Sequence, residues 1–406
     1  MSKLEELLTK LCPNGVEYKF LEEIFNTRNG YTPSKNKKDF WENGVIPWFR
    51  MEDIRVNGRI LNAALQYVSR EALKGKAFPK NSIIIATSAT IGEHALVTVE
   101  SLANQRFTYL MLKDEYKDRF DIKFIYYYCF RLDEYCLACL NQGNFASVDM
   151  KKFVKFKFPL PPLEVQREIV RILDNFTELT AELTAELTAR KKQYEYYRDK
   201  LLVYDKTIPM EKLGVTCEMK AGKAISSHLI STQETQDTPI KCYGGNGIRG
   251  YVKDFNEEGS FPIIGRQGAL CGNVNYAEGQ FYATEHAVVV KSKGKYNPRF
   301  LFHLLTHMNL NQYKSAGAQP GLAVKNIAEL VAPVPTMQHQ KKIIDILDNF
   351  ESICTDLNIG LPAEIEARQK QYEYYRDLLL TFVEQGNTIL TDRQTDRQTD
   401  RQTDIN

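Results

Sequence analysis

A duplication constrains this chain more than any other feature of its sequence. The string KQYEYYRD occurs at 192–199 and again at 370–377. Upstream, FPLPPLEVQREIVRILDNF at 158–176 matches APVPTMQHQKKIIDILDNF at 332–350. The chain therefore contains two copies of one plan, and each copy is predicted to be a globular part followed by a helical part.

The helical parts have apolar residues at spacings of three, four and seven, which predicts long coiled-coil helices that start after proline-rich segments. The first helix contains TELTAELTAELTA at 177–189, a repeat of good helix formers, and is predicted to be continuous. The second carries Gly360 and Pro362 at the corresponding place, which predicts a bend or a break.

The globular parts, 17–157 and 211–331, alternate β-branched runs with turn clusters. Both are predicted to mix α and β structure, with helices near 120–140 and 298–313. A weaker echo between the two parts pairs Gly30 with Gly222.

The 406 residues imply two or three domains, and no segment is apolar enough for a membrane span, so we expect a cytoplasmic protein. The formal net charge is only +2, so any binding of nucleic acid depends on local basic clusters such as 28–38 and 151–157.

A catalytic site is not evident in the sequence. The chain lacks a phosphate-binding GxxxxGK[ST] loop, a GxSxG elbow and an HExxH helix. Cys136 and Cys139 form a CxxC inside an aromatic run that reads as a buried helix, and no second ligand pair follows at zinc-finger spacing. His303 and His307 are one helical turn apart, but no glutamate lies between them. These patterns favour a protein that is not an enzyme, with no cofactor and no metal.

Several of these segments together resemble the specificity subunit of type I restriction-modification enzymes, in the subfamily that carries TAEL repeats. The resemblance rests on NGYTPSK and SIIIATSATIGEHALV in the first half, on YGGNGIRGYV and FPIIGRQGALCGNVNYAEGQFYATEHAVVV in the second, and on the helix starts, the TAEL repeat and the duplicated YEYYRD. It covers about residues 1–385.

The resemblance implies an α+β fold: two target recognition domains separated by two long antiparallel coiled-coil helices in a pseudo-twofold arrangement. It also implies that each domain reads one half of a bipartite site in double-stranded DNA. The helices would set the spacing and bind two methyltransferase subunits, and ATP-dependent restriction subunits would complete the nuclease. The methyl donor and ATP would belong to those partners.

These expectations divide the chain into five segments. They are target recognition domain 1 (1–160), the first helical spacer (161–205), target recognition domain 2 (206–335), the second helical spacer (336–385) and a disordered TDRQ-repeat tail (386–406).

Loop residues with groove-reading side chains are the candidates for DNA contact. In the first domain they are Arg28, Asn29, Tyr31, Lys35, Arg50, Ser88, Thr90, Gln105 and Arg106. In the second domain they are Lys220, Lys223, Asn246, Arg249, Arg266, Gln267 and His286.

The octapeptides supply the candidates for partner binding. Tyr194, Tyr197, Tyr372 and Tyr375 fall on the predicted helix seam, whereas Tyr196, Arg198, Tyr374 and Arg376 fall off it. Exposed Tyr and Arg residues are common anchors of protein interfaces, so this second group is predicted to dock partners.

Two other classes of function compete with the DNA-specificity hypothesis. One is a coiled-coil scaffold that pairs two protein-binding domains and never touches DNA. The other is an enzyme in which Cys136 and Cys139, or His303 and His307, bind a metal. DNA binding tested with a methyltransferase partner and metal analysis would distinguish them.

Deletion of one TAEL repeat gives a direct test of the spacer hypothesis. Four residues of helix are about 6 Å long and turn by about 400°, a net advance of about 40°. One base pair turns the duplex by a similar angle, about 36° for about ten base pairs per turn. The deletion should therefore shorten the gap in the DNA site by one base pair and leave both half-sites unchanged. Methylation mapping measures the gap, and an unchanged gap would contradict the hypothesis.

Overall fold

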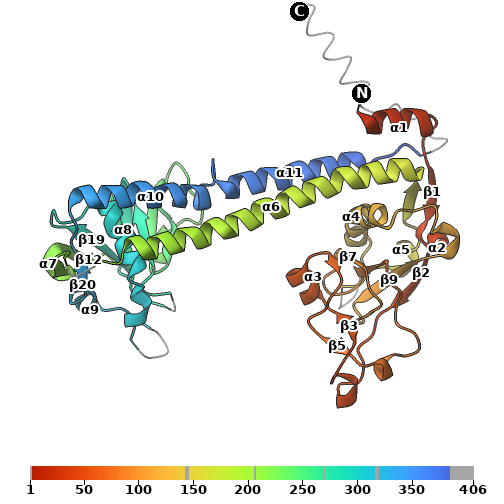
Figure 1. The fold of residues 1–406 in the computed structure, drawn as a ribbon, viewed down its shortest axis with the longest axis horizontal. Helices are drawn as coiled ribbons and strands as arrows, with labels where there is room; N and C mark the ends of the chain where they lie inside the picture. The colour runs from red at the N-terminus through yellow and green to blue at the C-terminus, as the bar shows by residue number, and fades with distance from the viewer. Residues whose placement is uncertain (1, 142–145, 205–206, 269, 316–319, 385–406) are drawn as a thin grey trace, which may run out of the picture. The chain divides into compact units, whose positions relative to one another are not determined.

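The computed structural model describes residues 2–141, 146–204, 207–268, 270–315 and 320–384, and the predicted TDRQ tail (386–406) lies outside them. The chain divides into two compact units, unit 1 (Met1–Thr180 with Arg368–Asn406) and unit 2 (Ala181–Ala367). Each unit is described by itself (Figure 1). None of the helices in the described residues is both long enough and apolar enough to cross a bilayer.

The two helical parts differ as predicted. Helix α6 (Leu163–Leu201) is continuous over 39 residues and belongs to unit 1 up to Thr180 and to unit 2 beyond it. The second part consists of α10 (Met337–Thr355) and α11 (Leu361–Leu379), and the break between them precedes Pro362. Gly360 fits this break because a Cβ there would crowd the backbone oxygens of Asp356 and Ser352.

Unit 1 contains three sheets, with strand orders β2-β9-β6-β7-β4, β5-β3-β8 and β1-β10. Its strands are β1 (Glu17–Phe20), β2 (Phe25–Asn29), β3 (Ile46–Phe49), β4 (Ile60–Leu61), β5 (Tyr67–Val68), β6 (Ser82–Ala86), β7 (His94–Val97), β8 (Leu102–Ala103), β9 (Phe107–Leu112) and β10 (Lys157–Leu160). Its other helices are α1 (Lys3–Leu11), α2 (Leu21–Ile24), α3 (Met51–Asn57), α4 (Ile122–Ala138) and α5 (Met150–Phe153), with short 3₁₀ turns at Lys38–Phe40, Arg70–Ala72 and Asp114–Tyr116.

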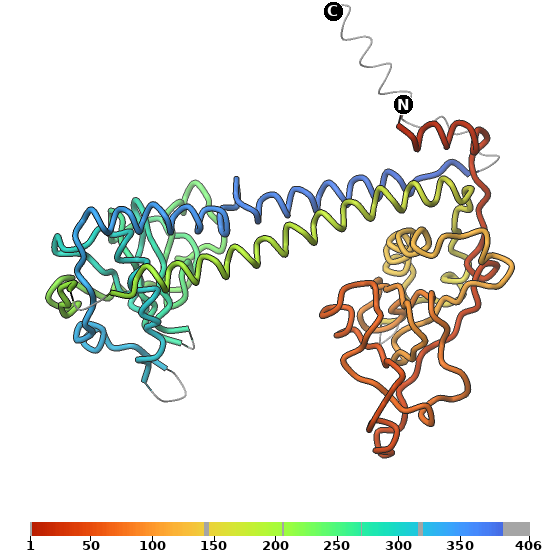
Figure 2. Tube along the Cα trace, viewed as in Figure 1, coloured from red at the N-terminus to blue at the C-terminus, as the bar shows by residue number. Residues whose placement is uncertain are grey.

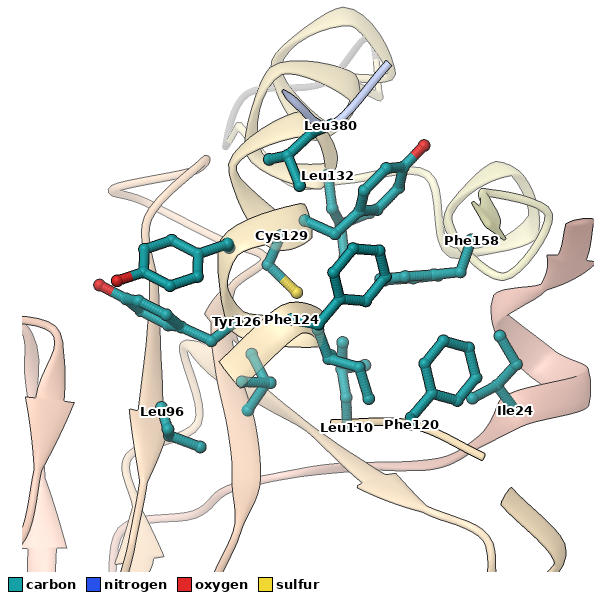
Figure 3. Close-up of a cluster of buried hydrophobic side chains, with 14 of the residues drawn as sticks. Ile24, Leu96, Leu110, Phe120, Phe124, Tyr126, Cys129, Leu132, Phe158 and Leu380 are labelled. Carbon is teal, nitrogen blue, oxygen red and sulfur yellow. The ribbon is translucent and has the colours of Figure 1, made fainter. Parts of the chain in front are cut away.

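One core cluster of unit 1 lies between α4 and the five-stranded sheet (Figure 3), and a second includes Trp48 and Phe49 of β3 with Tyr109 of β9. Phe124 and Cys129 of α4 pack with Leu96 of β7 and Leu110 of β9, and all four are buried. Leu380, just after α11, joins the same core. The apolar run that predicted a buried helix is therefore the helix that covers this sheet.

Unit 2 repeats this plan, with strand orders β12-β19-β16-β17, β14-β13-β18-β15 and β11-β20. Its strands are β11 (Met210–Lys212), β12 (Cys217–Ala221), β13 (Ile240–Gly244), β14 (Gly247–Val252), β15 (Glu257–Glu258), β16 (Phe261–Gly265), β17 (Val274–Ala277), β18 (Gln280–Ala283), β19 (Ala287–Ser292) and β20 (Val331–Pro333). Its other helices are α7 (Leu213–Thr216), α8 (Pro298–His307) and α9 (Val324–Ala328), with 3₁₀ turns at Ser227–Leu229 and Leu310–Tyr313. Helices α4 and α8 confirm the two predicted helical regions, and the α+β class with two sheet-bearing domains and long helices is confirmed.

A fully buried glutamine near the start of each long helix fixes that helix to its domain. In unit 1, Gln166 accepts a hydrogen bond from the backbone N–H of Asp121 (2.8 Å), the N-cap of α4, and donates to the carbonyls of Arg119 and Pro161 (2.8 and 2.7 Å). In unit 2, Gln340 accepts from the N–H of Asn297 (2.8 Å), the N-cap of α8.

The amide of Gln340 also donates to the carbonyls of Lys295 and Pro335, both at 2.9 Å. Each glutamine amide thus joins three backbone segments through three hydrogen bonds. Because the groups are buried, loss of the amide would leave backbone polar atoms without partners.

In unit 1 the segment that follows α11 contacts the chain around the start of β1 (Figure 2). Val16 donates its N–H to the Val383 carbonyl at 2.9 Å, and the Tyr18 hydroxyl donates to the Phe382 carbonyl at 3.1 Å. The segment that follows α11 therefore lies beside the strand that begins the first domain.

Candidate nucleic-acid interface

Sheet topology brings the candidate loops of unit 1 to one edge. Strand β9 runs antiparallel to both β2 and β6, so the carboxyl ends of β2 and β6 meet the amino end of β9. Arg28 and Asn29 end β2, Arg106 immediately precedes β9, and the Thr87 N–H donates to the Arg106 carbonyl at 3.0 Å. Loops far apart in sequence thus become neighbours.

Four of the candidates line a hollow of about 340 Å³ at this edge. They are Lys35, Arg50, Gln105 and Arg106, and its other lining residues are Thr32, Trp48, Met51, Glu52 and Asn104. Arg50 directly follows β3, which pairs in parallel with β8. The Asn104 N–H donates to the Phe49 carbonyl at 3.0 Å, and this contact places Arg50 beside the hollow. Three cations thus face one acid, Glu52, which forms an ion pair with Arg50 at 3.0 Å.

The other candidates of unit 1 lie outside the lining of this hollow. The Arg28 guanidinium lies over the Phe78 ring at 5.1 Å, and Asn29 accepts from the Thr108 hydroxyl at 2.9 Å. The Tyr31 hydroxyl accepts from the backbone N–H of Lys74 at 2.6 Å, so this side chain joins the loop after β2 to the segment around Lys74. Ser88 and Thr90 follow β6 and are half-buried.

Unit 2 presents the equivalent edge. Strand β19 runs antiparallel to both β12 and β16, and the Arg266 N–H donates to the His286 carbonyl at 2.9 Å, as Thr87 does to Arg106 in unit 1. The Thr284 N–H donates to the Tyr243 carbonyl at 3.0 Å, as Asn104 does to Phe49.

The pairing of Gly30 with Gly222 has a structural reason. The Gly30 N–H donates to the Phe107 carbonyl (2.9 Å), and the Gly222 N–H donates to the Ala287 carbonyl (3.0 Å). A Cβ on Gly30 would overlap the Ala103 carbonyl oxygen, and one on Gly222 would overlap that of Ala283. Only glycine permits this close approach of two backbones.

The candidates of unit 2 are less uniformly placed. Gln267 and His286 lie at the edge beside Arg266, and Lys223 just follows β12. Asn246 occupies the β13–β14 turn, whose Gly245 packs against the Gln267 carbonyl. Lys220 and Arg249 are exposed on strands rather than in loops, Lys220 within β12 and Arg249 within β14.

Four buried polar atoms at these two edges have no hydrogen-bond partner in the described residues. They are Arg50 Nε in unit 1 and Arg266 Nε, Glu285 Oε2 and His286 Nδ1 in unit 2, and others of this kind, such as His94 Nε2, lie elsewhere in the described residues. An unpaired buried polar group costs about 1–3 kcal/mol, so such atoms are well suited to bind a polar ligand. The same concentration of cations and free donors suits the edges of bases and phosphate oxygens.

Glu285 was not among the predicted residues. Its backbone position corresponds to that of Gln105, because ATEHA at 283–287 occupies the place of ANQRF at 103–107. Alignment of these two strings on their shared alanine would have identified it.

The octapeptides stack on the shared ILDNF segments of the opposite copy. Tyr197 stacks on Phe350 in unit 2 with ring centroids 5.3 Å apart, and Tyr375 stacks on Phe176 in unit 1 at 5.5 Å, both at 21° between planes. Tyr372 is buried. The predicted packing role of these tyrosines is confirmed.

The off-seam residues behave differently from one another. Tyr196 and Tyr374 are 59% and 65% exposed, as predicted. The two arginines are not exposed in this way: the Arg198 side chain is 20% exposed and that of Arg376 only 13%. Arg376 is covered because its guanidinium lies 4.5 Å from the centroid of the Phe130 ring. Arginine stems and heads stack readily on aromatic faces, which the linear pattern did not reveal.

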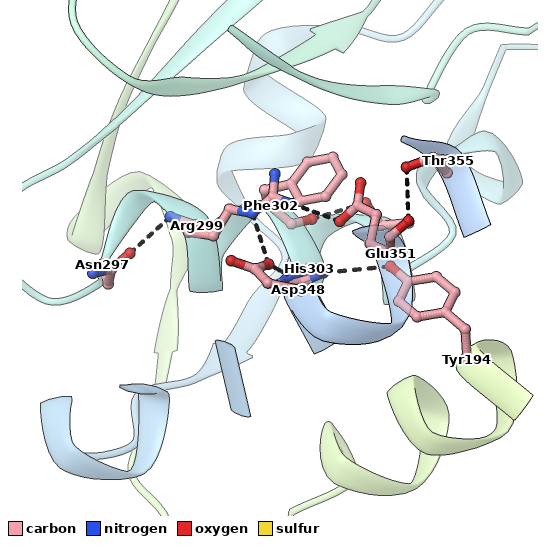
Figure 4. Close-up of polar contacts among 9 residues, drawn as sticks. Tyr194, Asn297, Arg299, Phe302, His303, Asp348, Glu351 and Thr355 are labelled. Atoms are coloured by element: carbon pink, nitrogen blue, oxygen red, sulfur yellow. Dashed lines mark hydrogen bonds and ion pairs between the residues drawn. The ribbon is translucent and has the colours of Figure 1, made fainter. Parts of the chain in front are cut away.

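The histidines do not share a site. The His303 ring contacts Asp348 at 2.7 Å and the Tyr194 hydroxyl at 3.4 Å (Figure 4). His307 instead contacts Asp199 at 3.0 Å. Burial lowers the pKa of His303 to about 4, although the hydrogen bond to Asp348 opposes this shift.

His303, Asp348 and Glu351 are close enough to surround a metal ion, but Arg299 already binds both acids, at 2.8 and 2.6 Å (Figure 4). In unit 1, Lys123 and Tyr127 bind Asp174 in the same manner, both at 2.7 Å. A repeated cation–carboxylate contact indicates a structural anchor for α4 and α8.

The cysteine pair is also buried. Cys136 lies within α4 and Cys139 is its C-cap. Burial raises the pKa of the Cys136 thiol to about 12, so this side chain stays protonated near neutral pH and is a poor metal ligand.

Comparison with known proteins agrees with this arrangement. The family model described as "Type I restriction modification DNA specificity domain" matches residues 13–190 and 210–367, once in each half. The Type I restriction enzyme EcoprrI specificity subunit of Escherichia coli is 55% identical over 374 residues, which cover 88% of this chain and 92% of that protein.

Two solved structures share the fold. The S subunit of a type I restriction-modification system from M. genitalium matches with a TM-score of 0.52 and 18% identity, covering 90% of this chain and 95% of that one. A chain from a study of complex assembly and conformational transition in the type I R-M system matches with a TM-score of 0.61 and 15% identity, covering 91% and 98%.

The duplicated family match and the high identity to a named specificity subunit give no support to a scaffold that never touches DNA. They also agree with a non-catalytic recognition component. The chain belongs to the type I restriction-modification DNA specificity family and is a DNA sequence-specificity subunit, which acts with methyltransferase and restriction subunits.

Proposed function

We propose that each unit reads one half of a bipartite DNA site with the sheet edge described above. The observation that carries this proposal is the equivalence of the two edges, in which the same backbone hydrogen bonds hold different polar side chains. Two domains that share a backbone arrangement but carry different side chains at the sheet edge are suited to recognise two different base sequences.

The predicted boundaries stand as part of this proposal. Target recognition domains at 1–160 and 206–335 would read DNA, and helical spacers at 161–205 and 336–385 would set the distance between half-sites. Arg28, Lys35, Gln105 and Arg106 are the strongest candidates in the first domain because they combine charge or hydrogen-bonding groups with exposure at the edge. The half-buried Arg50 joins them because it lines the hollow and its Nε has no partner in the described residues.

We further propose that two methyltransferase subunits dock on the two octapeptides. Tyr196 and Tyr374 each contact the next tyrosine in the sequence edge to face. The ring centroids are 5.5 Å apart with 75° between the ring planes for Tyr196, and 5.3 Å apart with 76° between the planes for Tyr374. Two exposed aromatic surfaces of equal geometry suit two copies of one partner.

Arg106 tests the DNA-reading edge of unit 1. In the complex with its methyltransferase partner, Arg106→Ala should weaken binding to the specific duplex about tenfold, since one good base contact is worth about 1–3 kcal/mol. Lys113→Ala is the matched control, because Lys113 follows the opposite end of β9. Titration of labelled duplex measures both variants. Equal affinities for the two variants would contradict the assignment of this edge.

Tyr196 and Tyr374 test the docking surface. Each Tyr→Ala change alone should reduce the number of methyltransferase subunits bound from two to one, and the double change should prevent assembly, because each ring is an exposed anchor for one partner. Native mass spectrometry counts the subunits. Retention of both partners by the double variant, with an unchanged melting temperature, would refute this docking site.

A further inference from the structure

We propose that Glu285 reads the exocyclic amino group of a cytosine or an adenine in the half-site contacted by unit 2. This inference deepens the proposed function and depends on it. It concerns one residue and one class of base atom.

The backbone around Glu285 is held firmly. On one side of Glu285, Thr284 donates its N–H to the Tyr243 carbonyl at 3.0 Å. On the other side, the carbonyl of His286 accepts from the Arg266 N–H at 2.9 Å. Glu285 lies between these two anchors, two residues before the start of β19 at Ala287. Its position is therefore set by the sheets on both sides and not by a free loop.

The carboxylate of Glu285 is only half satisfied. Oε1 lies 3.2 Å from His286 Nε2, whereas Oε2 is buried and has no hydrogen-bond partner in the part of the chain that the structure describes. A buried carboxylate oxygen needs a donor, and Arg266 and His286 at the same edge also carry unpaired atoms. The Glu285 side chain as a whole is 39% exposed, so a ligand at this edge can reach it.

The chemistry of DNA restricts what that donor can be. A carboxylate accepts hydrogen bonds and cannot donate them, and phosphate oxygens repel it. In the major groove the only donors are the N4 amino group of cytosine and the N6 amino group of adenine. A contact between Glu285 and the major groove is therefore a contact to a base amino group and not to the phosphate backbone.

Positive charge nearby offsets the repulsion between this carboxylate and the duplex. Arg266 lies beside the same edge, Lys223 donates its backbone N–H to the Ala283 carbonyl two residues before Glu285, and Arg249 is exposed on β14. These cations can take the phosphate contacts that Glu285 cannot.

The equivalent residue in unit 1 supplies a contrast within the same chain. Gln105 accepts a hydrogen bond from the Thr32 hydroxyl at 2.6 Å through its amide oxygen, so its N–H₂ group is the part offered as a donor. The two units thus present opposite hydrogen-bonding polarity at one structural position. Gln105 suits a base acceptor, and Glu285 suits a base donor.

The test uses the complex of the full chain with its methyltransferase partner and duplexes that carry the mapped methylation site. Each cytosine is replaced in turn by 2-pyrimidinone and each adenine by purine, which removes one amino group at a time. The wild-type complex should lose about 5- to 100-fold in affinity at one position of the half-site read by unit 2, and Glu285→Ala, which removes the acceptor oxygens, should reduce that loss at this position only.

Glu329→Ala is the matched control, because it makes the same change at an exposed residue that pairs with Lys212 beside β11. This variant should show the wild-type response to every analogue. A melting temperature for each variant shows that the fold is retained.

Two results would overturn the inference. One is a Glu285→Ala complex whose affinity changes equally on all duplexes, and the other is a Glu285→Ala complex that responds to every amino deletion as the wild-type complex does. If Arg106→Ala still weakens specific binding in that case, only the role of Glu285 fails. If Arg106→Ala also has no effect, the proposed DNA-reading edges fail with it.

Discussion

The side-chain amide of one buried glutamine in each unit is the contact on which the rest of the architecture depends. Gln166 and Gln340 each hold the N-cap of a domain helix, the turn before that helix and the proline that precedes the long helix. The domain helix in turn covers the sheet whose edge carries the candidate DNA contacts. These three hydrogen bonds in each unit, together with the contacts of Asp174 and Asp348 to the same domain helices, therefore hold that edge in a fixed orientation relative to the start of its own long helix.

The duplicated octapeptide completes this arrangement from the other copy. Phe176 of the first copy stacks on Tyr375 of the second, and Phe350 of the second stacks on Tyr197 of the first. Each unit thus contains the start of one helical part and the end of the other. This exchange explains why KQYEYYRD is kept in both copies while the sheet edges differ: the same tyrosines must fit the same ILDNF surface in each unit.

Repeats and periodicity predicted the two-domain plan, the continuous first helix and the interrupted second one, because such patterns depend on local sequence. The pairing of Phe49 with Ala103 and of Thr87 with Arg106 depends on sheet topology, which a linear reading does not provide. Glu285 was missed although Gln105 was found, because the strings ANQRF and ATEHA share only an alanine and their equivalence becomes plain only from the matching backbone hydrogen bonds. Arg376 was predicted to be exposed for the same reason, since Phe130 comes from a segment far away in sequence.

The most direct test of this account compares Gln340→Ala with Gln338→Ala, an exposed glutamine on the same helix. Hydrogen exchange of the α8 amides, followed by mass spectrometry, measures how firmly the domain helix is held. Loss of the buried amide leaves the Asn297 N–H without its partner, at a cost of about 1–3 kcal/mol, so the account predicts about 5- to 100-fold faster exchange in α8 for Gln340→Ala alone. Equal exchange in the two variants would contradict it.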